Sequence, residues 1–205
     1  MTVSLRDVKK SYGAIRVLEG ISLEIRAGSS LCIFGPSGCG KSTLLKIIAL
    51  MTRADSGSLM IDDRELSPAT MAEIEGVRRE KVSYAFQEPL LLPYLTALEN
   101  IVDIVDISKG EALEMLSSLG LADRIRHKPS KLSVGEKKRV DIARALLRKK
   151  EILVADEPFS NLDPDTVAIV MRQFDNHLTK GGILVFSSVD PSETRFAHKS
   201  LRMSS

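Results

Sequence analysis

The feature that most constrains this chain is a short glycine-rich stretch, GPSGCGKST, at Gly35–Thr43. An apolar run, Leu31–Phe34, comes directly before it, and the stretch that follows, Ser42–Leu50, has the pattern of a helix. A strand, a glycine-rich loop ending in lysine and a hydroxyl residue, and then a helix form the pattern G-x-x-x-x-G-K-[ST] of a phosphate-binding loop. The sequence therefore predicts an α/β fold that binds a nucleoside triphosphate.

Each part of this loop has a physical task. Glycines let successive backbone N–H groups turn inward and form an anion-binding nest, and the helix start near Lys41 adds free N–H groups. Lys41 brings a full charge to the β- and γ-phosphates, and the Ser42 hydroxyl is a hard oxygen ligand for Mg²⁺. The nucleotide-binding residues expected here are Gly35, Pro36, Ser37, Gly38, Cys39, Gly40, Lys41, Ser42 and Thr43.

A second apolar run, Ile152–Ala155, ends in two adjacent carboxylates, Asp156 and Glu157. In a parallel α/β sheet, ligands gather at the carboxyl ends of the strands. We therefore expect Asp156 to face the Mg²⁺ shell and Glu157 to hold and deprotonate an attacking water. The sequence has no NKxD-like motif for reading guanine, which favours ATP over GTP.

Apolar spacing elsewhere predicts strands near positions 3–8, 21–25, 57–61 and 183–186 and a helix over 165–178. From about position 97 to 148 the pattern is helical. An α/β core interrupted by a helical insert is the arrangement that this order predicts.

Composition excludes several classes of protein. The 205 residues suit one domain, and a net charge of +2 without a long basic tract argues against nucleic-acid binding. The densest basic run, Lys137–Arg139, is expected to be a solvated turn of a helix. Cys32 and Cys39 have no paired spacing, which favours a reduced compartment over a disulfide framework. No signal peptide and no apolar run long enough to span a bilayer is visible, so another chain would supply any membrane crossing.

The stretch Leu132–Leu146 reads LSVGEKKRVDIARAL. It resembles the LSGGQ-x-[QK]-R-x-x-[IL]-A-R-A-L signature of ATP-binding-cassette (ABC) ATPases, and the resemblance extends over nearly the whole chain. In this family Tyr12 matches the aromatic residue that stacks on adenine, and Gln87 matches the Q-loop glutamine that senses Mg²⁺ and water and connects to a transmembrane partner. Ser160–Pro164 resembles the D-loop.

The resemblance implies a single ABC ATPase domain with a P-loop NTPase (RecA-like) core and a mixed sheet over residues 1–88 and 150–205. An α-helical subdomain would occupy residues 89–149. The chain would be an ATPase that uses ATP and Mg²⁺. The implied catalytic residues are Glu157, Lys41 and Gln87, and the implied Mg²⁺ ligands are Ser42, Gln87 and Asp156.

The resemblance also implies partners. Ser133 and Gly135, at the start of the signature helix, would form an anion site that closes on the nucleotide of a facing subunit in a head-to-tail dimer. The dimer would be a homodimer, or a heterodimer with a second ABC subunit. A separate transmembrane permease would hold it peripherally on the cytoplasmic, inner face of the cell membrane, with its coupling helix in a groove near Gln87.

The segment Phe86–Asn100 resembles the same segment of the ABC ATPases that power lipoprotein release, macrolide and peptide export, or cell-division complexes. This resemblance favours a function in export or membrane extraction. The residues that carry this likeness are Phe86, Gln87, Leu92, Pro93, Leu95, Thr96, Glu99 and Asn100.

Three positions depart from the family pattern. The histidine that contacts the γ-phosphate is replaced by Ser188, or by Val189 if the alignment is anchored on the following Asp-Pro. Val134 stands where the signature has glycine, and a β-branched residue resists positive φ and crowds the approach to phosphate. Glu136 replaces a glutamine, which suits the first turn of a helix. We therefore expect slow turnover.

Two alternatives remain open at this stage. One is a nucleotide-gated structural or regulatory subunit that binds ATP and hydrolyses it only weakly. The other is a soluble ABC ATPase without a permease. The cargo and the direction of transport are not specified by these motifs.

Overall fold

The computed structural model describes residues 1–204. The strands are β1 (Thr2–Tyr12), β2 (Ile15–Arg26), β3 (Ser30–Phe34), β4 (Ser56–Ile61), β5 (Arg64–Glu65), β6 (Val82–Ala85), β7 (Ile152–Ala155), β8 (Ile183–Ser188) and β9 (Lys199–Arg202). The α-helices are α1 (Lys41–Ile48), α2 (Met71–Lys81), α3 (Glu99–Val105), α4 (Lys109–Ser118), α5 (Val134–Leu147) and α6 (Pro164–Thr179). Short 3-10 helices are η1 (Ala122–Arg124), η2 (Pro129–Lys131) and η3 (Pro191–Phe196).

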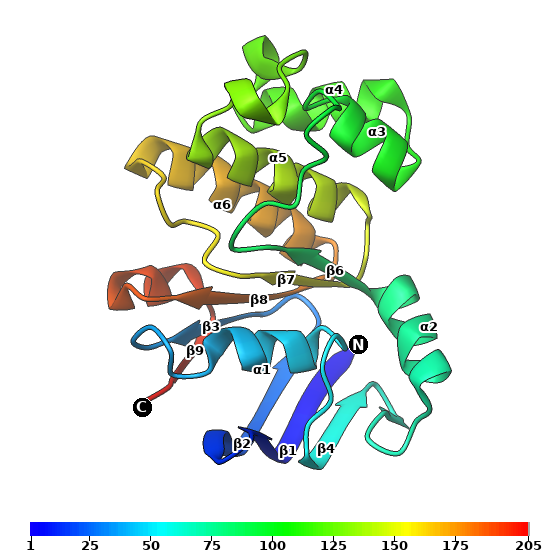
Figure 1. Cartoon of the computed structure of the whole chain (residues 1–205), viewed down its shortest axis with the longest axis vertical. Helices are drawn as coiled ribbons and strands as arrows, with labels where there is room; N and C mark the ends of the chain where they lie inside the picture. The colour runs from blue at the N-terminus through cyan, green and yellow to red at the C-terminus, as the bar shows by residue number, and fades with distance from the viewer. Residues whose placement is uncertain (205) are drawn as a thin grey trace.

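The strands form two sheets that lie on either side of α1 (Figure 1). One sheet is antiparallel, in the order β2-β1-β4-β5, and the other is parallel, in the order β6-β7-β8-β3-β9. Because the second sheet is parallel, the carboxyl ends of its strands meet at one edge, where the segments after β3, β6, β7 and β8 converge. The glycine-rich loop, Gln87, Asp156 and Glu157 follow strands at this edge.

The central strands of the parallel sheet, β3, β7 and β8, consist mainly of apolar residues because both of their faces are buried. Ile33, Val154 and Val185 belong to a core shared with α1 and the antiparallel sheet. Their strand neighbours Cys32 and Leu153 belong to a second core, built with the helices on the other face. The parallel sheet therefore separates two hydrophobic cores, and α5 and α6 cover the face opposite α1 (Figure 1).

One buried amide organises the segment between β6 and α3. The Asn100 side chain is fully buried, and its Oδ1 accepts the Leu92 N–H at 2.7 Å. Its Nδ2 lies 3.1 Å from the carbonyls of Leu92 and Leu95 and 2.9 Å from that of Thr96. A loop that would otherwise bury unpaired backbone groups is thereby fixed in one conformation.

The predicted fold class is confirmed, and so are the strands and helices expected from apolar spacing. Sequence analysis did not identify α2, β6 or β9. The strand β9 pairs in parallel with β3 although far from it in sequence. The domain boundaries at 88 and 150 stay a prediction, since α5 packs both on α3 and α4 and on the parallel sheet. Within residues 1–204, no helix combines the length and apolar character needed to cross a bilayer.

Candidate nucleotide-binding and hydrolysis site

The glycine-rich loop connects β3 to α1, as expected. Gly38 and Gly40 have φ of 82° and 96°, a region that residues with a side chain avoid. A Cβ at Gly40 would also lie 2.7 Å from Val17 Cγ1, whereas a Cβ at Gly38 would meet no atom within 4 Å. The loop is thus packed on its inner side and open in front of Gly38, which leaves room for a ligand.

Lys41 is buried inside this loop. Its Nζ donates to the carbonyls of Gly35 and Pro36 at 2.9 and 3.0 Å. The ammonium group is therefore held against the loop backbone, and no carboxylate within residues 1–204 pairs with it. A positive charge among inward-turned N–H groups is the arrangement that binds phosphate.

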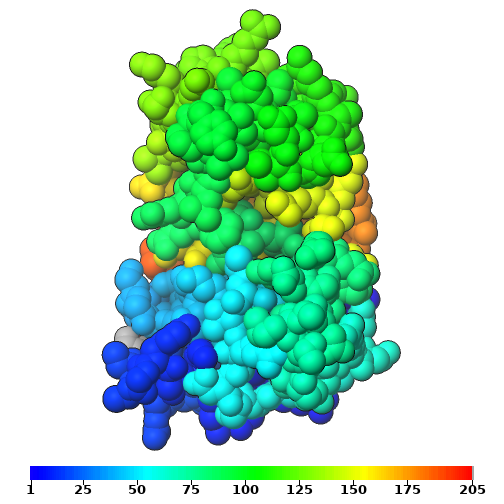
Figure 2. All heavy atoms as spheres, turned by 45° about the vertical axis from the view of Figure 1, so that its right-hand side comes forward, coloured from blue at the N-terminus to red at the C-terminus, as the bar shows by residue number. Residues whose placement is uncertain are grey.

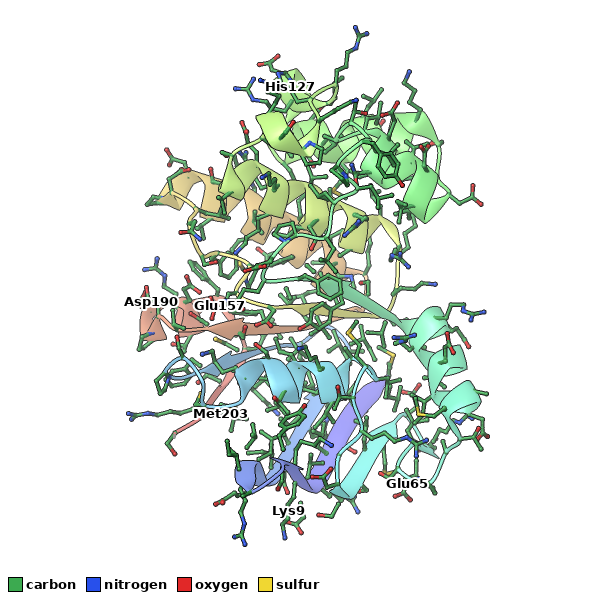
Figure 3. All side chains as sticks on the ribbon, in the orientation of Figure 1. Lys9, Glu65, His127, Glu157, Asp190 and Met203 are labelled. Atoms are coloured by element: carbon green, nitrogen blue, oxygen red, sulfur yellow. The ribbon has the colours of Figure 1, made fainter. Side chains whose placement is uncertain are left out.

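The residue that follows β9 packs against the start of the loop through its backbone. The Met203 N–H donates to the Phe34 carbonyl at 2.8 Å, and a Cβ at Gly35 would lie only 2.3 Å from the Met203 carbonyl oxygen. Glycine at position 35 is therefore required by this close backbone approach. Met203 lies at the same edge of the sheet as Glu157 (Figure 3).

The two carboxylates after β7 reach the same edge. Asp156 is buried, whereas the carboxylate of Glu157 accepts from Gln87 Nε2, with Oε2 at 3.1 Å. Glu157 has a φ of 46°, which costs a residue with a side chain on the order of 1 kcal/mol and is typical of functional sites. The predicted catalytic pair Gln87 and Glu157 is thus brought together by the ends of β6 and β7.

The end of β8 bears on which of the two residues, Ser188 or Val189, stands at the position of the missing histidine. Ser188 is only 2% exposed, and its hydroxyl accepts the Asp190 N–H at 2.9 Å and donates to the Asp190 carbonyl at 3.0 Å. Val189, the next residue, is 48% exposed. Because the Ser188 hydroxyl is occupied by backbone and turned inward, Val189 is the better candidate for the histidine position.

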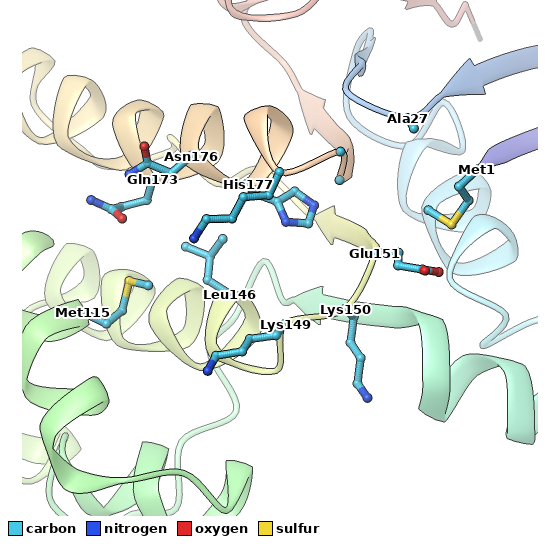
Figure 4. A pocket seen from close by; sticks show the side chains of 13 residues that line it. Met1, Ala27, Met115, Leu146, Lys149, Lys150, Glu151, Gln173, Asn176 and His177 are labelled. Carbon is cyan, nitrogen blue, oxygen red and sulfur yellow. The ribbon is translucent and has the colours of Figure 1, made fainter.

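The other histidines lie elsewhere. His177 Nε2 lies 3.1 Å from the Ile183 carbonyl, at the opposite end of β8, and His198 Nδ1 lies 2.8 Å from Ser30 Oγ, at the start of β3. A cavity of about 530 Å³ beside His177, lined also by Lys149, Lys150 and Glu151, is therefore separate from this site (Figure 4).

The signature segment starts α5 with a capping box. The Ser133 hydroxyl accepts the Glu136 N–H at 3.1 Å, and the Glu136 carboxylate accepts the Ser133 N–H at 2.8 Å. The latter bond and an ion pair with Arg124 keep the pKa of Glu136 below its ordinary value, against the opposing effect of burial. The helix start predicted for Ser133 and the preference for an acid at position 136 are confirmed.

Val134 and Gly135 occupy the first turn of α5. Val134 does not have a positive φ, so the expected backbone strain is wrong, and its side chain is exposed. A Cβ at Gly135 would lie 3.0 Å from Leu162 Cδ2 and 3.3 Å from the Asn161 carbonyl oxygen. Gly135 thus lets the signature helix pack closely on the D-loop of the same chain.

The expectation of a solvated turn at Lys137–Arg139 is wrong for Lys138. This side chain is 2% exposed, and its Nζ donates to the Glu157 carbonyl at 2.7 Å and to the Ser160 carbonyl at 3.3 Å; it also contacts the Ser160 hydroxyl. Burial lowers the pKa of Lys138, although nearby carboxylates act in the opposite direction. Lys138 therefore connects α5 to the segment after β7 that carries the predicted catalytic carboxylate.

Two further residues near the Q-loop were missed. The Asp141 carboxylate accepts the Phe86 N–H at 2.8 Å and pairs with Arg144, whose guanidinium also donates to the Leu90 carbonyl at 2.8 Å. Burial raises the pKa of Asp141. An acid at a core position of an apolar helical stripe was the available signal, because such a residue needs a partner.

Tyr12 lies apart from these residues, in β1, with its ring exposed and the Lys10 ammonium 5.5 Å from the ring centroid. Its exposure is what a stacking platform for a base requires. The oxygen donors of Ser42, Asp156 and Gln87 are the types that Mg²⁺ prefers, so the donor set fits the ion.

Comparison with known proteins identifies the family. The profile of the family described as ABC transporter matches residues 18–160. The lipoprotein-releasing system ATP-binding protein LolD of Bacteroides thetaiotaomicron is 42% identical over 168 residues, covering 78% of this chain and 77% of that protein. The macrolide export ATP-binding/permease protein MacB of Marinobacter nauticus is 34% identical over 213 residues, covering 98% of this chain and 33% of that protein.

A solved structure agrees with the sequence comparisons. The ATP-binding cassette MJ0796, in a dimeric post-hydrolysis state bound to ADP and Pi, superposes with a TM-score of 0.90 at 33% identity, over 98% of this chain and 94% of that one. The matching fold and the converging loop, carboxylates and glutamine have one common explanation. The chain belongs to the ABC transporter family, as an ATP-binding subunit of the ATPase type.

Proposed function

We propose that this chain hydrolyses MgATP in a head-to-tail dimer and thereby drives a separate transmembrane permease. The observation that carries the proposal is the hydrogen bond between Gln87 and Glu157 at 3.1 Å, beside the loop that holds Lys41. The water-activating carboxylate is thus linked to the segment expected to contact the permease. A change at the nucleotide can therefore alter the permease contact directly.

Binding uses the loop and the sheet edge. The loop glycines, Lys41 and Thr43 would hold the phosphates, and Tyr12 would stack on adenine. Ser42, Asp156 and Gln87 would hold Mg²⁺, which neutralises charge on the β- and γ-phosphates when bound. Glu157 orients a water for in-line attack on the γ-phosphate and accepts its proton.

Dimerisation follows from the position of the signature segment. Ser133, Val134 and Gly135 begin a helix at which Ser133 and Val134 are exposed, and the helix N-terminus favours an anion. We infer that this surface closes on the phosphates bound by a second subunit, either another copy or a second ABC subunit.

A groove beside the Q-loop suits the permease. A cavity of about 370 Å³ lies between α2, the end of α5 and the segment after β6. Met51, Phe86, Leu90 and Ile104 contribute apolar surface, and four arginines line it without any carboxylate: Arg78, Arg79, Arg144 and Arg148. In Figure 2 the yellow end of α5 is visible between the green helices above and the blue-green α2 below. Permease docking here would place the subunit on the cytoplasmic face of the membrane.

The relatives favour a class of cargo. LolD proteins from several bacteria are named as parts of a lipoprotein-releasing system, and MacB is named for macrolide export. We infer that this chain serves extraction or export of a lipophilic cargo from a membrane, with the cargo chosen by the permease.

The test compares the natural chain with Glu157→Gln and Lys41→Ala. With MgATP, light scattering of Glu157→Gln is expected to show doubled mass, because ATP is bound and not cleaved. Lys41→Ala is expected to stay monomeric, and the natural chain to release phosphate above the Glu157→Gln background. The proposal would be refuted if no variant retained nucleotide and no variant formed dimers.

A second candidate is a nucleotide-gated subunit that scarcely hydrolyses ATP. The observation that favours it is the exposed Val189 at the end of β8, which cannot donate a hydrogen bond to a γ-phosphate. This candidate predicts ATP-dependent dimers of the natural chain without phosphate release above the Glu157→Gln background.

A further inference from the structure

A buried hydroxyl at the end of β8 contacts both catalytic carboxylate residues. Ser187 is 0% exposed and follows the fully apolar run Ile183–Phe186. A polar side chain at such a position must find partners within the protein. Nothing in the nucleotide-binding motifs accounts for it.

Ser187 uses its hydroxyl twice. Its Oγ donates to Asp156 Oδ1 at 2.5 Å and accepts the backbone N–H of Glu157 at 2.9 Å. A hydroxyl has one donor hydrogen, and here it points to a carboxylate, which makes the bond short and strong. One side chain thus fixes the carboxylate of Asp156 and the backbone of Glu157.

The second oxygen of Asp156 has a weaker partner. The Tyr84 hydroxyl lies 3.4 Å from Asp156 Oδ2, which is longer than a good hydrogen bond between two oxygens. Because the shorter bond, from Ser187, goes to Oδ1, Oδ2 is the oxygen with the weaker protein partner and the more available one for a metal ion. The arrangement resembles an outer-shell support of a metal ligand, which fixes the direction of the ligand.

We propose that Ser187 is a positioning residue that orients Asp156 toward Mg²⁺ and holds the Glu157 backbone in its left-handed conformation. The inference rests on the proposed function, because it concerns the same nucleotide site. It assigns to β8 a role that does not depend on the missing histidine: the strand supports the metal side of the site through Ser187 and leaves the γ-phosphate side to Val189.

The experiment measures the free Mg²⁺ concentration that half-saturates binding of a fluorescent mant-ATP. Ser187→Ala is expected to raise this midpoint about tenfold, as loss of outer-shell support commonly does. Ser187→Cys keeps the size of the side chain with a weak donor and is expected to raise it as well. Ser187→Thr keeps the hydroxyl and is expected to restore a midpoint within about twofold of the natural chain.

The control is Ser30→Ala, a buried serine at the opposite end of the same sheet whose hydroxyl bonds His198. It is expected to leave the Mg²⁺ midpoint unchanged. Binding of mant-ATP in EDTA, which depends on the phosphate loop, is expected to be equal in all variants.

An unchanged or lower midpoint in Ser187→Ala and Ser187→Cys would overturn the inference. A parallel loss of binding in EDTA would do so too, because it would show a general structural role. If the natural chain itself bound no mant-ATP, the proposed function would fail together with this inference, whereas normal binding by the natural chain with indifferent Ser187 variants would overturn the inference alone.

Discussion

At the scale of single residues, we expect the end of β8 to limit the rate of ATP hydrolysis. Val189, which we assign to the position of the family's histidine, is exposed, and Ser188 is buried with its hydroxyl bound to Asp190. We expect Val189→His to raise the rate of phosphate release about tenfold or more, because it supplies a donor for charge on the γ-phosphate. Ser188→His is expected to give no gain, since a ring does not fit a buried serine site. An unchanged rate for Val189→His, with nucleotide still bound, would show that the imidazole is not limiting.

Lys138 is the second residue with an outsized effect. Its buried ammonium group donates hydrogen bonds to the carbonyls of Glu157 and Ser160. Lys138→Met is expected to lower the free energy of unfolding by about 1–3 kcal/mol, because it removes charge-assisted hydrogen bonds to both carbonyls, of which that of Glu157 keeps the Ser160 hydroxyl as a donor. Lys138→Gln retains a donor and is expected to lose less. Urea denaturation measures both, with the neighbouring Lys137→Met as a control expected within about 0.5 kcal/mol of the natural chain.

At the scale of elements, the capping box of α5 makes stability depend on pH. The pKa of Glu136 is lowered in the folded chain, so the ionised carboxylate stabilises the fold above its ordinary pKa. That contribution is lost as the pH falls through the lowered folded-state pKa. Glu136→Gln is expected to reduce the loss of stability between pH 7 and the acidic range, as measured by urea denaturation across that range. An identical pH profile in the variant would contradict this prediction.

The segment between β6 and α3 depends on Asn100. Asn100→Ala removes the partner of one buried N–H and of several carbonyls, and we expect it to destabilise the chain by about 1–3 kcal/mol. Hydrogen exchange of the Leu92 amide should rise by more than that of core strands, because the loop opens locally. The exposed Asn176→Ala on α6 is the matched control. Equal exchange in both variants would mean that the loop is held by other contacts.

At the scale of the whole molecule, the arginine-lined groove predicts the chemistry of the permease contact. Arg148 is exposed in this groove and makes no ion pair within residues 1–204. We expect Arg148→Glu to lower recovery of a co-expressed permease at least about fivefold, because it reverses the sign of a charge facing the partner. Arg172→Glu on α6, outside the groove, is the control. Equal recovery with both variants would place the permease contact elsewhere.

How much of the fold and of the site can be predicted from the sequence depends on how far apart the interacting residues lie along the chain. Local patterns predicted the phosphate loop, the apolar strands and the start of α5, since each is fixed by neighbours in sequence. The strand β9 could not be predicted, because its residues are polar and its pairing with distant β3 supplies the stability. Lys138 was misread for a related reason: a charge in a basic run looks solvated until the D-loop of the same chain is seen to cover it. Likewise, the turn after β8, where the Ser188 hydroxyl bonds the Asp190 backbone, decides between Ser188 and Val189, and apolar spacing along the strand does not contain that information.

The division of the interior by the parallel sheet has an evolutionary consequence. Alternate residues of β3, β7 and β8 serve different cores, so substitutions on one face of a strand do not require repacking of the other. Lineages of such a chain can adapt the helical side to a new membrane protein while the nucleotide side drifts slowly. Sequence divergence among descendants is then expected to accumulate around α3 and α4, near the proposed permease contact, with the ATP-handling half inherited nearly intact.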